Sequence, residues 1–294
     1  MLRKLLFLLA TFCTVAGAQT YEPAVSMASF LRMKPQLNTA EPSIADNELD
    51  LVFAPQGDFE AQVIYRNGSQ IIQQVTAKPS QRFGTMARLK WNRKTIPLGT
   101  ESGPRSIEVM LDGKSVGLLE FTLTKSGGDD PFDPKPTWIL DGPWSDLAYF
   151  THPVSDANQQ RINFHYWSKK GDLGGQKGMI DVVMKRGDKI LAKTNSSEAS
   201  YDFYLHRDMP LLKPDRQPVM VPDLKSMEGP FVMELSHKGK VVKRFRGSIS
   251  GGKFVPHSRS ALDYQPRNKF LTPRTVGEKG GQIDSKLYNW LTRE

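Results

Sequence analysis

Five basic side chains gather within nine residues of one predicted β-hairpin, at Lys238, Lys240, Lys243, Arg244 and Arg246. Cations at this density could bind an anion such as an acidic polysaccharide or a lipid headgroup, with nucleic acid the least expected of these ligands. An exposed strand is also commonly charged to prevent it from pairing with another sheet, and that role needs no ligand. The sequence leaves both interpretations open.

Aromatic residues crowd the stretch from residue 138 to residue 167, beginning with Trp138 and Trp144. Exposed rings in such a group could stack on the faces of sugars, and the 238–246 cations could assist them. Packing in the core is the more usual role of large aromatic side chains. We therefore expect these rings to be core residues and keep a carbohydrate-binding module as the alternative.

The spacing of polar residues predicts no catalytic centre. No His-Glu-x-x-His motif occurs among the five histidines. Asp112-Gly113-Lys114-Ser115 ends like a phosphate-binding loop but lacks the glycine required upstream. The stretch 247–251 has Ile249 where a nucleophile elbow requires serine. We expect a protein that is not an enzyme and that carries no cofactor and no metal.

One metal hypothesis stays open in the predicted linker. Asp129, Asp130 and Asp133 supply the hard oxygen ligands that Ca²⁺ prefers. Their spacing matches no known calcium loop, and acidic residues are common in solvated linkers. A plain linker is the simpler interpretation.

The first 18 residues predict a secretory signal. Arg3 and Lys4 precede an apolar stretch that runs to about Val15, and the small residues 16–18 suit a signal peptidase. Cys13 is the one cysteine of the chain, so the expected mature chain has no thiol chemistry. No later stretch reaches the length of a membrane-spanning helix. We expect an exported protein of the periplasm or the extracellular space.

The chain contains an internal repeat. Residues 61–72 match residues 180–191, and residues 103–123 match residues 229–249. The turn glycines Gly68 and Gly187 are 119 residues apart, and Gly113 and Gly239 are 126 residues apart. Two matches in one order at nearly one offset indicate a tandem duplication.

Each copy consists of short alternating runs separated by turn residues, which predicts an all-β fold. The pattern resembles the immunoglobulin-like or fibronectin-type antiparallel β-sandwich, and this resemblance implies a fold without an activity. We expect sandwiches at 19–125 and 137–252, joined by a linker at 126–136. A basic C-terminal arm at 253–294 follows and is mostly extended.

The end of the arm predicts a short helix with Leu287, Trp290 and Leu291 on one side. Residues 253–294 carry a charge of +4 out of the +7 expected for the mature chain. Because a helix so short needs something to pack against, we expect the arm to dock on a partner. The sequence thus predicts an exported binding or structural protein of the bacterial envelope or extracellular space, whose partner is a protein or an anionic polysaccharide.

Overall fold

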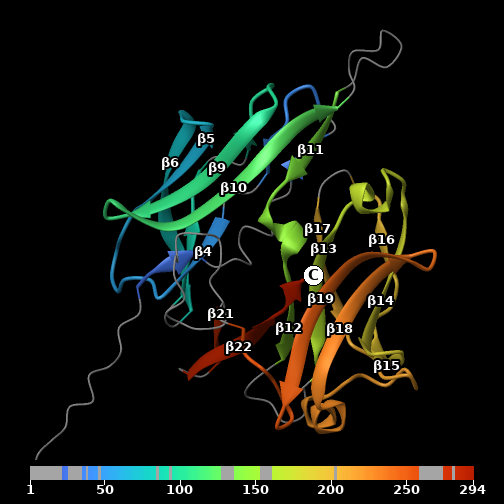
Figure 1. The fold of residues 1–294 in the computed structure, drawn as a ribbon. Helices are drawn as coiled ribbons and strands as arrows, with labels where there is room; N and C mark the ends of the chain where they lie inside the picture. The colour runs from blue at the N-terminus through green and yellow to red at the C-terminus, as the bar shows by residue number, and fades with distance from the viewer. Residues whose placement is uncertain are drawn as a thin grey trace, which may run out of the picture.

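The computed structural model describes residues 22–25, 35–37, 39–45, 48–83, 86–92, 95–126, 136–152, 161–201, 204–257, 274–279 and 282–294. These residues form antiparallel strands and three short 3₁₀ helices (Figure 1). The helices are η1 (Pro143–Asp146), η2 (Lys170–Leu173) and η3 (Val221–Met227). The predicted all-β class is therefore confirmed.

An eight-stranded sheet dominates the first half of the chain. Its strands, in spatial order, are β1 (Ala24–Val25), β4 (Glu48–Val52), β7 (Met86–Lys90), β6 (Gln70–Phe83), β5 (Ala61–Asn67), β9 (Gly103–Leu111), β10 (Lys114–Ser126) and β11 (Thr137–Asp141). The long strand β6 pairs with β5 along its first part and with β7 along its second. A small sheet adds β2 (Pro35–Gln36), β3 (Ser43–Ile44) and β8 (Ile96–Pro97).

Two sheets make up the second half. The five-stranded sheet has the order β17 (Leu205–Pro210), β13 (Asn163–Ser168), β12 (Ala148–His152), β22 (Gln282–Trp290) and β21 (Arg274–Lys279). The seven-stranded sheet has the order β15 (Lys189–Lys193), β14 (Gly178–Arg186), β18 (Gly229–His237), β19 (Lys240–Ser250) and β20 (Lys253–Phe254). In it, β16 (Ser197–Ala199) also pairs with β14, and β23 (Thr292–Arg293) pairs with β19.

The two sheets of the second half enclose one apolar core. Phe150, Phe164 and Tyr166 project from the five-stranded sheet into the same buried cluster as Phe231 and Met233 of the seven-stranded sheet. The opposite face of the five-stranded sheet is also buried, where the core of the first half continues onto its aromatic side chains. The strands β12 and β13 are thus covered on both faces.

The repeat predicted from the sequence is present in the strand registers. Val63 lies opposite Val109 across β5 and β9, and Val182 lies opposite Leu235 across β14 and β18. These pairs are related by the same offsets of 119 and 126 residues as the turn glycines. The β5–β6 and β14–β15 hairpins also share a bulge at the same place, after Tyr65 and after Met184 respectively.

A cross-strand ion pair is repeated as well. Arg66 Nη2 lies 3.4 Å from Glu108 Oε2 in the first copy, and Lys185 Nζ lies 2.5 Å from Glu234 Oε2 in the second. The partners occupy equivalent positions of β5 and β9, and of β14 and β18. The copies therefore share register, bulge and charge pairing.

The helix predicted at the C-terminus is wrong, because this segment forms the strand β22. It pairs with β12, where Trp290 lies opposite Tyr149. Trp290 and Leu291 are adjacent in sequence and are both buried, on opposite faces of the sheet. Because these two neighbours face different cores, both are apolar, and their spacing imitated a helix.

The predicted linker lies largely outside the described residues. The strand that follows it, β11, pairs with β10, so that Trp138 lies opposite Lys125. The segment 137–141 therefore adds to the sheet of the first half, whereas the sequence predicts it at the start of the second sandwich. The division into two sandwich domains stays a prediction.

Candidate functional site

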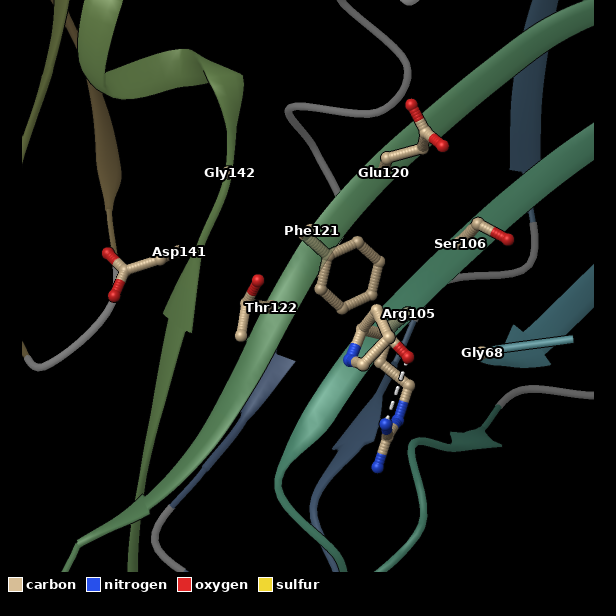
Figure 2. Close-up of a pocket in the computed structure, with 9 residues that line it drawn as sticks. Gly68, Arg105, Ser106, Glu120, Phe121, Thr122, Asp141 and Gly142 are labelled. Carbon is tan, nitrogen blue, oxygen red and sulfur yellow. Dashed lines mark hydrogen bonds between the residues drawn. The ribbon is translucent and has the colours of Figure 1, made fainter.

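A pocket of about 310 Å³ opens beside β9 and β10, where the first sheet meets the β11–η1 connection (Figure 2). Its lining residues come from these two strands, from the turn after β5 and from the end of β11. They are Gly68, Pro104, Arg105, Ser106, Glu120, Phe121, Thr122, Asp141 and Gly142.

The pocket presents hydroxyl and carboxylate groups around an aromatic ring. Figure 2 shows Ser106, Glu120 and Thr122 along the neighbouring strands, with Asp141 across from them. The Phe121 ring packs on Trp144, at 6.3 Å between centroids. Such a lining suits hydrogen bonding to a small polyhydroxylated molecule. The lining residues include no histidine, cysteine or lysine.

Arg105 uses its donors within the fold rather than offering them to the pocket. Its Nε donates to the carbonyl of Leu98 and its Nη2 to the carbonyl of Glu101, each at 2.5 Å. Its Nη1 donates to Asn67 Oδ1, also at 2.5 Å. Burial lowers the pKa of Arg105. The side chain thus ties the β8–β9 connection to the end of β5.

Two of the predicted hairpin cations pair with carboxylates on the surface. Arg244 Nε lies 2.9 Å from Glu234 Oε1, and Arg246 pairs with Glu294 at the end of the chain. The Arg244 partner comes from the neighbouring strand β18. These two charges are therefore offset by the chain itself.

Lys238 and Lys240 lie at the turn between β18 and β19 and are both exposed. Lys238 has a positive φ of 48°, like Asp112 at the equivalent turn of the first copy, where φ is also 48°. Arg244 and Arg246 are exposed as well but are paired, so among the described residues the tip carries the exposed cations of this group that pair with no carboxylate.

Lys243 is buried, with a side chain only 3% exposed. Its Nζ lies 2.9 Å from Asp172 Oδ2 and donates to the carbonyl of Trp167 at 3.1 Å. It also lies 4.7 Å from the centre of the Tyr204 ring. Burial lowers the pKa of Lys243, against the opposing effect of Asp172. This residue therefore holds β19 to the end of β13 and to η2.

Trp138 and Trp144 lie in the core, as expected, and not on the surface as the carbohydrate-binding alternative requires. Trp138 is 1% exposed and Trp144 is 7% exposed. Trp138 Nε1 donates to the carbonyl of Thr39 at 3.1 Å. Trp144 packs edge-on against Tyr204, at 6.3 Å between centroids. Neither ring offers a free face on which a sugar could stack.

The three predicted docking residues of the arm lie in or next to β22. Leu287 lies opposite His152 in the pairing with β12. The Trp290 ring packs on Tyr149 at 4.9 Å between centroids, and Leu291 belongs to the core between the two sheets. This part of the arm docks on its own chain.

A histidine cluster that the sequence analysis missed lies on the same sheet face as Trp290. His165 Nδ1 lies 3.3 Å from His206 Nε2, and the Tyr149 hydroxyl lies 3.2 Å from that same nitrogen. On its other side, His165 Nε2 contacts Thr151 Oγ1 at 2.7 Å and Asp208 Oδ1 at 3.5 Å. Tyr149 and His165 stack with their ring centres 4.4 Å apart.

The environment of His206 disfavours its charged form. Burial and the neighbouring His165 lower the pKa of His206 to about 3, although Asp208 acts in the opposite direction. The sequence does contain one signal for this site, which is the alternation of side chains along β13. His165 lies between Phe164 and Tyr166, and because these two rings face the other core, His165 must face the opposite side of the sheet. The partner strand could not be identified from sequence spacing.

Within the described ranges, no group of three or more His, Cys, Asp or Glu side chains is arranged to hold a metal ion. The three aspartates of the calcium hypothesis lie outside the described residues, so that hypothesis remains a prediction. None of the helices in the described part of the chain is long and apolar enough to cross a membrane.

The comparisons with known proteins identify no relative. No protein-family model, no curated protein and no solved structure matches the chain.

Proposed function

We propose that the protein is an exported, non-enzymatic binding or structural protein of the bacterial envelope or extracellular space, built from two tandem immunoglobulin-like sandwiches. The observation that carries this proposal is the repeated unit of β5, β6, β9 and β10 and of β14, β15, β18 and β19, with one register and one bulge. Sandwich units of this kind are common in extracellular domains, a fold-level analogy that supports the proposal.

The binding surface of this proposal is the tip of the β18–β19 hairpin. Lys238 and Lys240 are exposed there, whereas Lys243, Arg244 and Arg246 pair with carboxylates of the chain. Exposed cations on a mature chain with an expected net charge of +7 favour a partner with an acidic surface or an anionic polysaccharide. The end of the basic arm contributes indirectly in this proposal, by completing the sheets beneath the hairpin.

Cross-linking of the native protein in its cellular location, followed by identification of what is captured, tests this proposal. The variant Lys238→Glu/Lys240→Glu should lose the captured partner, because it reverses the charge of the tip. The matched control Lys114→Glu/Lys253→Glu makes the same change of net charge at two exposed lysines elsewhere. Equal capture by both variants would reject the hairpin tip as the binding surface.

The second candidate function is a carbohydrate-binding accessory module, which the hydroxyl- and carboxylate-lined pocket beside β10 favours. A glycan array is the direct test. If a glycan binds there, Glu120→Gln should weaken it roughly tenfold, the effect of losing one charged hydrogen bond. Glycan binding that is insensitive to Glu120→Gln and Thr122→Val would exclude this pocket as the site.

A further inference from the structure

The two copies of the repeat place equivalent strands at the edges of their sheets. Among the strands that the structure describes, the first part of β6 pairs with β5 alone, and β15 pairs with β14 and has one further bridge at its end (Figure 1). The registers align the two edges residue by residue, because Arg66 lies opposite Ile71 and Lys185 lies opposite Ile190. Equivalent positions can therefore be compared directly.

Two features of the β15 edge hinder its pairing with another strand. Lys189 and Lys193 place charges on it, and inward or exposed lysines are a common protection of sheet edges. Lys193 also exchanges backbone hydrogen bonds with Leu212, at 2.8 and 2.7 Å, which covers the end of the strand. This edge is closed to a further strand at that end.

The equivalent edge of β6 carries neither charge. Gln70 stands where the second copy has Lys189, and Gln74 stands where it has Lys193. No charged residue occurs from Gln70 to Ala77, and Ile71 is 47% exposed. Uncharged strands of Gln, Ile, Val and Thr are well suited to pairing edge to edge. Both edges have a bulge at the same place, next to Ile72 in β6 and next to the equivalent residue in β15. The bulge therefore does not explain why one edge is charged and the other is not.

We propose that the β6 edge is a self-association surface on which β6 of a second copy pairs antiparallel. A two-fold axis near Ile72 would place Gln70 opposite Gln74 of the second copy, and no like charges would meet. The same arrangement of β15 would place Lys189 opposite Lys193 of the second copy, which is destabilising. This inference is independent of the proposed function.

A second copy is the occupant because the strand is complementary to itself: Gln70 and Gln74 can meet across the two-fold axis without bringing charges together. Two copies of the mature chain, each with an expected net charge of +7, repel one another over most of their surface, which weakens this pairing. The contact of two edge strands is also small, below the area of a standard stable interface. The expected assembly is a weak dimer whose population rises with protein concentration.

The test measures the mass of the mature protein in solution by light scattering or sedimentation over a range of concentrations. The wild type should pass from monomer to dimer. The variant Gln70→Lys/Gln74→Lys transfers the lysines of the second copy to the first and should raise the dimer Kd by about tenfold or more. The control Thr122→Lys/Thr124→Lys adds the same charge to exposed positions of β10, which is paired with both β9 and β11.

A chemical cross-link provides a second readout. Ile71 and its equivalent Ile190 are 47% and 46% exposed, and either can be replaced by cysteine. A short bismaleimide should join two copies of Ile71→Cys, since diagonal neighbours across paired strands lie roughly 7–8 Å apart. It should not join two copies of Ile190→Cys.

Three results would overturn the proposal. These are a wild type that stays monomeric at its highest soluble concentration, a dimer that persists in folded Gln70→Lys/Gln74→Lys, and equal cross-linking of the two cysteine variants. Circular dichroism of each variant establishes that it is folded.

Discussion

Lys243 and His206 show how burial changes what an ionisable side chain does. Lys243 is one of five clustered cations in the sequence, yet it is the one that the fold encloses with Asp172. A buried ion pair adds little net stability relative to apolar residues, but removal of one partner leaves a costly unpaired charge. His206 is held neutral for a related reason, because its surroundings cannot solvate the imidazolium ion.

Lys243→Met should destabilise the protein by about 3 kcal/mol, because it keeps the aliphatic stem and leaves the Asp172 carboxylate without its buried cation. Denaturant unfolding measures the change. Lys240→Met, at an exposed position of the same strand, should change the free energy of unfolding by less than about 0.5 kcal/mol. Similar losses in both variants would contradict the structural role of the buried pair.

The stability of the protein should fall as the pH decreases from 6.5 towards 3. His206 has a pKa of about 3 in the fold and an ordinary value of 6.5, so the unfolded chain takes up a proton first. The contribution of His206 to the free energy of unfolding is complete above pH 6.5 and declines by up to about 1.4 kcal/mol per pH unit below this value.

Replacement of His206 by Gln should flatten this part of the pH–stability profile, measured by denaturant unfolding at several pH values. His237→Gln changes a histidine at the β18–β19 turn and should leave the slope as it is in the wild type. A profile of His206→Gln parallel to that of the wild type would show that another group controls acid sensitivity.

At the scale of elements, the last strands of the chain connect the two sheets of the second half. β22 extends the five-stranded sheet beside β12, and β23 pairs with β19 of the seven-stranded sheet. The end of the chain therefore contacts both sheets. These pairings predict that the last residues of the arm are needed for stability.

Trp290→Ala should reduce the free energy of unfolding by about 3 kcal/mol, because it removes a buried ring that packs on Tyr149. Arg293→Ala is the neighbouring control, as its partly exposed pair with Asp146 is worth less than about 1 kcal/mol. Thermal or denaturant unfolding compares the two. If Trp290→Ala behaved like Arg293→Ala, the packing of β22 against β12 would be refuted.

At the scale of the whole molecule, the two halves share part of one core. Trp144 joins them, with Phe121 of β10 and Tyr204 each at 6.3 Å between ring centres. The cluster that fills the first half also includes Tyr149, Trp167 and Trp290 from the second. The halves of the molecule are therefore expected to unfold together.

Calorimetry of the intact chain should show a single cooperative transition, because unfolding of one half would expose aromatic surface of the other. Trp144→Ala should lower its midpoint and separate the melting of the halves. Two well-separated transitions in the wild type would contradict a shared core.

The sequence by itself determined the β-class and the internal repeat. Both rest on local signals, since turn glycines such as Gly68 and Gly187 and the runs beside them are legible in one short segment at a time. The same signals predicted which residues form the repeated hairpins, and the strand registers agree.

Only the tertiary structure decided which side chains meet. It buried Lys243 with Asp172, joined His165 to His206 across β13 and β17, and made a strand of the segment read as a helix. The physical reason is that burial and pairing depend on contacts between residues far apart in the chain. Trp290 and Leu291 look like one helical face until a sheet covered on both sides separates them.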